Sequence, residues 1–265
     1  MITITPIPAL DSNYIWVIRP RPEADFVYVV DPGDATAVIR YLQQYQLKLC
    51  GILITHRHRD HIEGVAELLR RWQVPVYGPK AESIPCVTHF LTDGDQLQLE
   101  DLRFQVIAVP GHTWEHIAYF SNDNQNPPLL FCGDALFAGG CGRRFDGTAE
   151  IMWDSLTKLA CLPDNTLMYC THEYTLANLE FANAVEPDNE ALTARLVEVS
   201  QMRQRHEITL PSTILAEKRT NPFLRCSCDD VKRFVEQRLG HSCKTDAQVF
   251  GGLRLIKDYW PDPVK

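Results

Sequence analysis

Four side chains that can bind a metal ion lie close together, directly after a short apolar run. They are His56, His58, Asp60 and His61. His56 and His58 are two residues apart, a spacing that turns side chains to one side of an extended segment but in different directions on a helix. The intervening Arg57 and Arg59 stay protonated and have no lone pair to offer a metal. A solvated charged loop would account for one histidine pair but not for this cluster, so the stretch predicts a metal site.

Further candidate ligands follow apolar runs in the same way. His112 follows the run 104–109, Asp134 follows 129–132, and His172 follows 167–170. Continuous apolar runs of this length are typical of strands buried on both faces, and loops at strand ends can present a site on a rigid sheet. A single histidine is more often structural, but repeated strand ends that carry ligands indicate one site. Asp31 and Asp34 are interpreted as turn residues, one of them with an outer contact to a ligand, and the alternative is that they are distant ligands.

Elements that must position these residues can be read from the periodicity. Strands are expected at 14–18 and 26–30, and helices at 35–45, 63–72 and 148–162. Strands mixed with helices are typical of a layered α/β fold. Beyond His172 the pattern predicts helices and no strong strand, over 174–182, 189–205, 212–219, 229–239 and 246–259. We therefore expect a metal-binding domain at 1–172 and a helical domain at 173–265.

Composition excludes several classes of partner. The chain has 265 residues, a net charge of −8 and no long basic run, which disfavours binding to nucleic acid. No stretch of about 18 apolar residues suggests a membrane span. The nine cysteines are scattered and odd in number, and no export signal precedes them, so we expect reduced thiols in the cytoplasm.

The pattern His-x-His-x-Asp-His resembles the signature of the metallo-β-lactamase superfamily. The stretches 132–149, 171–175 and 221–225 are similar to those of glyoxalase II, the hydroxyacylglutathione hydrolases, and the resemblance covers essentially the whole chain. It implies an αββα sandwich followed by an all-helical domain that binds glutathione. It also implies hydrolysis of S-D-lactoylglutathione and related 2-hydroxyacylglutathiones to D-lactate and glutathione, the second step of methylglyoxal detoxification.

The resemblance implies two divalent metal ions per chain. One would be bound by His56, His58 and His112 and the other by Asp60, His61 and His172, with Asp134 as the bridge. Imidazoles and carboxylates suit zinc, with iron and manganese as alternatives. Two divalent cations, the catalytic carboxylates of Asp60 and Asp134, and a bridging hydroxide leave one positive charge. That charge favours the negative charge that develops on a carbonyl oxygen under attack.

Substrate contacts are implied at Arg143, Phe145, Tyr174 and Arg225. The two arginines could bind glutathione carboxylates through charge-assisted hydrogen bonds. A thiol leaves readily as thiolate, so no general acid is required. Some positions depart from the family pattern: Glu115 stands where the family usually has glycine, Phe145 lacks a hydroxyl that some relatives carry, and no second basic residue follows Arg225.

We expect a monomer that acts on a small-molecule glutathione thioester. The alternatives are a mononuclear-iron persulfide dioxygenase and another hydrolase of the same fold, such as an exported β-lactamase. The dioxygenase would use fewer ligands than are present, and a non-catalytic binding protein would be expected to have lost some of them.

Overall fold

The computed structural model describes residues 2–123 and 127–260, and the chain divides into two compact units. Unit 1 consists of Met1–Val109, Glu115–Gly133 and Tyr169–His172. Unit 2 consists of Pro110–Trp114, Asp134–Met168 and Glu173–Lys265. The chain therefore passes between the units several times before its C-terminal segment begins.

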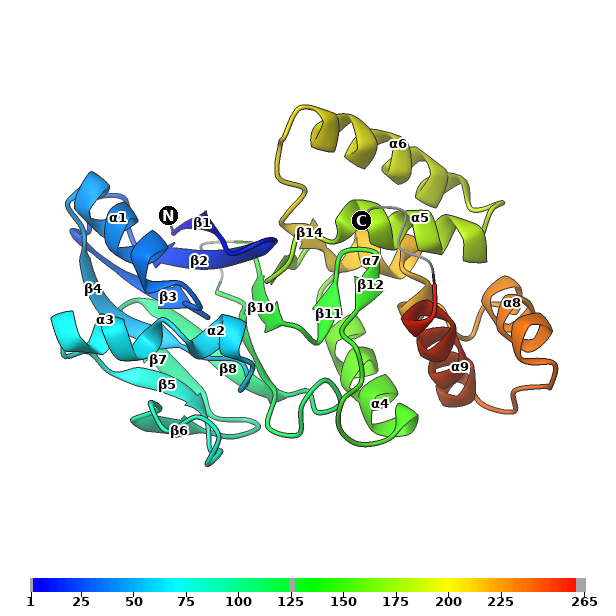
Figure 1. Ribbon diagram of the computed structural model, residues 1–265, viewed down its shortest axis with the longest axis horizontal. Coiled ribbons are helices and arrows are strands. Elements are labelled where there is room, and N and C mark those ends of the chain that lie inside the picture. The colour runs from blue at the N-terminus through cyan, green and yellow to red at the C-terminus, as the bar shows by residue number, and fades with distance from the viewer. Residues whose placement is uncertain (1, 124–126, 261–265) are drawn as a thin grey trace. The chain divides into compact units, whose positions relative to one another are not determined.

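The first sheet of unit 1 is built from the N-terminal part of the chain (Figure 1). Its strands follow one another in the order β1 (Thr3–Ala9), β2 (Asn13–Arg19), β3 (Phe26–Val30), β4 (Lys48–Leu53), β5 (Val76–Pro79) and β6 (His89–Leu91). The pairs β1–β2 and β2–β3 are antiparallel, and the pairs from β3 to β6 are parallel.

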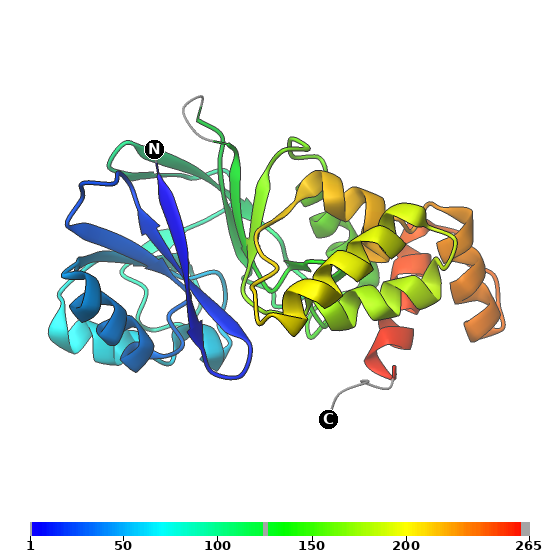
Figure 2. The same cartoon turned by 90° about the horizontal axis from the view of Figure 1, so that it is seen from above.

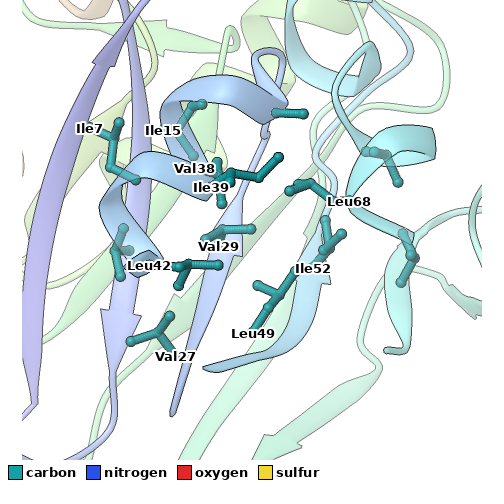
Figure 3. Packing of buried hydrophobic residues seen from close by; sticks show 14 of the residues in the cluster. Ile7, Ile15, Val27, Val29, Val38, Ile39, Leu42, Leu49, Ile52 and Leu68 are labelled. Carbon is teal, nitrogen blue, oxygen red and sulfur yellow. The ribbon is translucent and has the colours of Figure 1, made fainter. Parts of the chain in front are cut away.

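Helices α1 (Ala35–Tyr45), α2 (Arg59–Ile62) and α3 (Val65–Arg71) accompany this sheet. Helix α1 begins where the Asp34 side chain accepts hydrogen bonds from the amides of Thr36 and Ala37, which satisfies donors that a helix start leaves open. The apolar side of α1 and Leu68 of α3 pack on alternate residues of the strands, such as Val29 and Ile52 (Figure 3). This packing fixes the end of β4, from which the metal-binding stretch departs.

The second sheet of unit 1 carries the other apolar runs. Its strands are β7 (Gln96–Leu99), β8 (Leu102–Ala108), β9 (Ile117–Ser121), β10 (Leu129–Gly133) and the last residues of β13 (Leu167–Cys170), in the order β13-β10-β9-β8-β7. Strands β8 and β10 are each antiparallel to β9, so they run in the same direction and end at the same edge of the sheet. Their following residues lead to His112 and Asp134, which explains why ligands follow these runs.

Unit 2 is largely helical. Its helices are α4 (Ala149–Ala160), α5 (Thr175–Val185), α6 (Glu190–Gln204), α7 (Ile214–Thr220), α8 (Asp229–Leu239) and α9 (Asp246–Asp258), with a 3₁₀ turn at Pro222–Leu224. Helices α5 and α6 lie side by side (Figure 2). Phe223 packs between Phe181 and Phe250, with ring centroids 6.1 and 6.0 Å apart, and these buried rings form part of the core.

A short hairpin of unit 2, β11 (Leu136–Phe137) with β12 (Gly140–Cys141), is held by buried polar groups. The Glu217 carboxylate is fully buried and accepts hydrogen bonds from the Gly139 amide at 2.8 Å and from Arg195 Nη2 at 2.6 Å. Asn221 Nδ2 contacts the same carboxylate at 3.0 Å and the Phe137 carbonyl at 3.2 Å. The hairpin is thereby attached to α6 and α7.

Two differences from the sequence-based expectation add an element that was not expected. The helix expected at 63–72 is preceded by the separate helix α2, and the break falls at Gly64, where an added Cβ would lie 2.4 Å from the Pro32 carbonyl oxygen. The helix expected from 212 begins at Ile214, because Ser212 and Thr213 form the short strand β14, which pairs with the start of β13. Thr213 then caps α7 by accepting from the Ala216 amide. Among the described helices, none is long and apolar enough to cross a membrane.

Candidate metal centre

Unit 1 brings together three of the expected ligands, Asp60, His61 and His172. Asp60 Oδ2 lies 3.4 Å from His61 Nε2 and 3.4 Å from His172 Nε2. Tetrahedral zinc with ligand bonds of about 2.0–2.1 Å places its ligand atoms about 3.3–3.4 Å apart. Both distances therefore match the ligand spacing that one ion requires.

The same unit places His56 beside His58. His56 Nε2 and His58 Nδ1 are 3.0 Å apart, close to the separation of two nitrogens on one ion. His56 is fully buried and continues the extended segment that leaves β4, whereas His58 stands at the N-terminus of α2. The two-residue spacing of His56 and His58 therefore falls where the extended segment after β4 leads into the short helix α2.

Unit 2 contains the two remaining expected ligands. His112 Nε2 lies 3.4 Å from Asp134 Oδ2, and His112 Nδ1 donates to the Arg143 carbonyl oxygen at 2.7 Å. A Cβ added to Gly142 would lie 2.0 Å from the Asp134 carbonyl oxygen and 2.8 Å from His112 Nδ1. Glycine is therefore required here to let the backbone pass beside both ligands.

Three ligand rings of unit 1 are also held through their second nitrogen. His61 Nδ1 contacts Asp31 Oδ2 at 2.9 Å, His172 Nδ1 contacts Ser12 Oγ at 3.0 Å, and His56 Nδ1 contacts Thr55 Oγ1 at 3.0 Å. Because the Thr55 hydroxyl donates to Asp31, it can accept from His56, and the Asp31 carboxylate can only accept from His61. The Nε2 atoms of these two rings are therefore left to present a lone pair. Such outer contacts fix the ring tautomer and orientation for a metal.

Asp60 remains ionised in this setting. Burial raises its pKa, but without a metal the protonated imidazoles of His172 and His61, together with the Asn13 amide, outweigh burial and hold the pKa of that carboxyl well below its usual range. Asn13 Nδ2 donates to Asp60 Oδ2 at 3.0 Å. Gly33 lets the backbone at Asp60 pass close to the backbone at residue 33, because a Cβ on Gly33 would lie 1.8 Å from the Asp60 carbonyl oxygen.

Asp31 and Asp34 have different roles. Asp34 is the N-cap of α1, as a turn residue would be, whereas Asp31 is buried and accepts from the Thr55 amide at 2.8 Å as well as from His61. The outer contact weighed for one of the two therefore belongs to Asp31. Sequence patterns did not assign a contact to Ser12 or Asn13, because these residues lie 160 and 47 positions from His172 and Asp60. Thr55 directly precedes His56, but the hydrogen bond between their side chains depends on the local fold.

Three of the expected substrate contacts are accessible in unit 2. Arg143 is exposed, and its Nε donates to Asp258 at 3.3 Å. The exposed ring of Phe145 lies edge-on to His112, with centroids 5.3 Å apart. The exposed ring of Tyr174 stands edge-on to the buried Phe137 of the β11–β12 hairpin.

Arg225 already has a carboxylate partner within unit 2. Its Nε and Nη2 each lie 2.9 Å from an oxygen of Glu186, and its Nη1 donates to the Lys218 carbonyl oxygen at 3.2 Å. The hydrogen bond to Glu186 raises the pKa of Arg225. These contacts occupy three of the five N–H groups of a guanidinium.

Comparisons with known proteins cover nearly the whole chain. The profile described as the metallo-beta-lactamase superfamily matches residues 9–172, and that of the hydroxyacylglutathione hydrolase C-terminus matches residues 173–260. The hydroxyacylglutathione hydrolase of Chromohalobacter salexigens is 48% identical over 97% of this chain and 99% of its own length. That of Pseudomonas aeruginosa is 49% identical over the same shares.

Solved structures show the same fold. ETHE1 from Myxococcus xanthus superposes with a TM-score of 0.67 at 26% identity, over 99% of this chain and 93% of that one. A metallo-beta-lactamase from Staphylococcus aureus has a TM-score of 0.64 at 20% identity, over 97% and 71%. The expected α/β sandwich of the metallo-β-lactamase type with a C-terminal helical region is thus confirmed. The chain is an enzyme that belongs to the hydroxyacylglutathione hydrolase family.

Proposed function

We propose that this enzyme hydrolyses S-D-lactoylglutathione and related 2-hydroxyacylglutathiones with two divalent metal ions. The observation that carries the proposal is the ligand spacing. Within unit 1, Asp60 Oδ2 lies 3.4 Å from each of two histidine nitrogens. Within unit 2, His112 Nε2 lies 3.4 Å from Asp134 Oδ2. Rings held through their second nitrogen support the same conclusion.

The ligands divide into two sets. Asp60, His61 and His172 would hold one ion, and His56, His58 and His112 would hold the other, with Asp134 shared between them. The donor set of imidazoles and carboxylates fits zinc, and iron and manganese are accepted by the same donors.

Two bound ions would supply Lewis acidity at the thioester carbonyl and lower the pKa of a water molecule to about 7. The residues of the chain then have defined tasks. Asp60 and Asp134 would offset part of the cationic charge. Asp31, Ser12 and Thr55 keep the rings oriented, so no reorientation is needed during the reaction.

The glutathione part of the substrate would be recognised in unit 2. Arg143, Phe145 and Tyr174 are accessible there, and Arg225 has N–H groups beyond those that Glu186 and Lys218 engage. A guanidinium and a peptide carboxylate form strong, directional hydrogen bonds. The domain division at 172/173, a cytoplasmic location, a monomeric state and a role as the second step of methylglyoxal detoxification belong to the same proposal.

Metal analysis combined with an Asp134→Ala variant tests the proposal. Wild-type protein should contain about two equivalents of zinc, iron and manganese combined. It should release thiol from S-D-lactoylglutathione, and Asp134→Ala should lower kcat by more than about 100-fold with a smaller change in KM. Asp154→Ala, which removes an exposed carboxylate of α4, is the matched control and should retain activity.

Other results would contradict the proposal. A single iron that cannot be supplemented, together with oxygen consumption on a glutathione persulfide, would favour the dioxygenase. Near-native kcat of Asp134→Ala with both ions bound would show that Asp134 is not the bridge.

A further inference from the structure

The segment Glu115–Ile117 of unit 1 runs alongside the metal-binding stretch and contacts three successive residues of it. The Ile117 amide donates to the Thr55 carbonyl oxygen at 3.0 Å, the His116 ring stacks on His56 with centroids 4.6 Å apart, and Glu115 contacts Arg57. The pairs run in opposite directions along the two segments, as in an antiparallel ladder. The segment therefore sets the register of the stretch that carries His56.

Glu115 makes two hydrogen bonds with Arg57. Its Oε1 accepts from the Arg57 backbone amide at 3.0 Å, and its Oε2 accepts from Arg57 Nη1 at 2.6 Å. The Glu115 side chain is 10% exposed and that of Arg57 is 29% exposed, so solvent screens this pair only partly. A bond to the backbone amide acts on the main chain itself rather than on a side chain alone.

The Arg57 amide lies in the backbone that joins two expected metal ligands. Arg57 lies between His56 and His58, and its amide belongs to the peptide that joins it to His56. Holding this peptide restricts the rotations that set the separation of the two rings, which is 3.0 Å between His56 Nε2 and His58 Nδ1. Ligands that are ordered before binding lose less conformational freedom when an ion arrives.

We infer that Glu115 is a positioning residue for the metal ion that His56 and His58 bind. The inference rests on the proposed function and deepens it. The ion pair with Arg57 neutralises the negative charge of Glu115. Glu115 therefore acts on the positions of His56 and His58 rather than on the net charge of the site.

A matched pair of variants isolates this contribution. The neighbouring ion pair between Arg59 and Glu63 uses the same residue types in the same stretch, but the side chains are 84% and 57% exposed. An exposed pair of this kind contributes little. Glu63→Ala is therefore the control for Glu115→Ala. Glu115→Gln retains an oxygen that can accept from the Arg57 amide but loses the ionic bond.

The measurement is a competition titration of the zinc-loaded enzyme with a chromophoric chelator, which yields a dissociation constant for each ion. Glu115→Ala should weaken one ion by about 10- to 100-fold, the range for loss of an outer contact, and leave the other unchanged. Glu115→Gln should stay within about threefold of wild type, since it keeps the amide acceptor. Glu63→Ala should match wild type for both ions.

Three results would overturn the inference: Glu115→Ala with both constants unchanged, both ions weakened alike in Glu115→Ala, or Glu115→Gln as weak as Glu115→Ala. The last would assign the effect to the ionic bond rather than to the amide. If Glu115→Ala does not fold, Glu115→Leu takes its place, because leucine keeps side-chain volume but has no oxygen that can accept from the Arg57 amide, and the same weakening of one ion is expected. Failure of the proposed function can be told apart from failure of this inference, because in the former case the wild-type protein itself would not bind two ions.

Discussion

Replacing Arg225 with alanine should weaken the fold as well as substrate binding. The guanidinium is paired with Glu186 through two hydrogen bonds of 2.9 Å, and the Glu186 side chain is 3% exposed while that of Arg225 is 25% exposed. Removing the arginine leaves a buried carboxylate without its cation. If Arg225 also binds a glutathione carboxylate, the variant loses that contact in addition.

The magnitudes of the two effects can be separated. Breaking a fully buried pair costs about 3–5 kcal/mol and an exposed pair about 0–1 kcal/mol, so this partly buried pair should contribute about 2–4 kcal/mol. For a chain of this size that loss corresponds to a fall in Tm of roughly 5–15 °C. A charge-assisted hydrogen bond to substrate contributes about 1.5–3 kcal/mol, which predicts a KM raised roughly 10- to 150-fold with kcat nearly unchanged.

Thermal unfolding and steady-state kinetics should be measured on Arg225→Ala, Glu186→Ala and the double variant. Arg219→Ala removes an exposed arginine of α7 and is the matched control. The double variant should be more stable than the sum of the single losses implies, because no buried charge remains unpaired. A thioester without glutathione carboxylates should be hydrolysed equally poorly by wild type and Arg225→Ala. An unchanged Tm in Arg225→Ala would refute the structural reasoning, and an unchanged KM would refute the substrate contact.

Two further predictions concern buried groups. Asp31→Asn should lower the affinity for one metal ion by about 10- to 100-fold in the chelator titration, because an amide can present a donor to His61 instead of an acceptor. An unchanged affinity would show that Asp31 does not orient the His61 ring. Native protein treated with iodoacetamide at about pH 8 should react at the exposed Cys161 and not at Cys141, because burial raises the pKa of Cys141 to about 11 and keeps it a neutral thiol below that pH. Mass spectrometry that finds equal labelling at Cys161 and Cys141 would contradict this.

Local pattern was sufficient for the elements that carry the ligands. The apolar runs before His112, Asp134 and His172 form β8, β10 and β13, since the runs are short, continuous and bounded by turn residues. The expected helix at 35–45 matches α1 in both of its ends, because the capping Asp34 stands just before an amphipathic run.

Contacts between residues far apart in the sequence could not be predicted from local pattern. Glu115 was recognisable as a departure from the family pattern, but its partner Arg57 precedes it by 58 positions and no periodicity relates the two. Arg225 was read as a substrate residue, whereas Glu186, 39 positions earlier, gave no signal that it would pair with it. The short strand β14 was missed because two residues carry no periodic pattern, and its pairing with β13 depends on packing.

The buried Glu217 carboxylate has a consequence for how this protein can be divided or recombined. A fragment that stops at residue 172 would keep the β11–β12 hairpin but lose Glu217, Arg195 and Asn221, which hold it. The Gly139 amide would then have to find water in place of a fixed acceptor, and the hairpin begins only two residues after Asp134. Exchange of C-terminal segments between related enzymes should therefore preserve the matched hairpin, and a breakpoint before residue 134 is more compatible with this arrangement than one at 172.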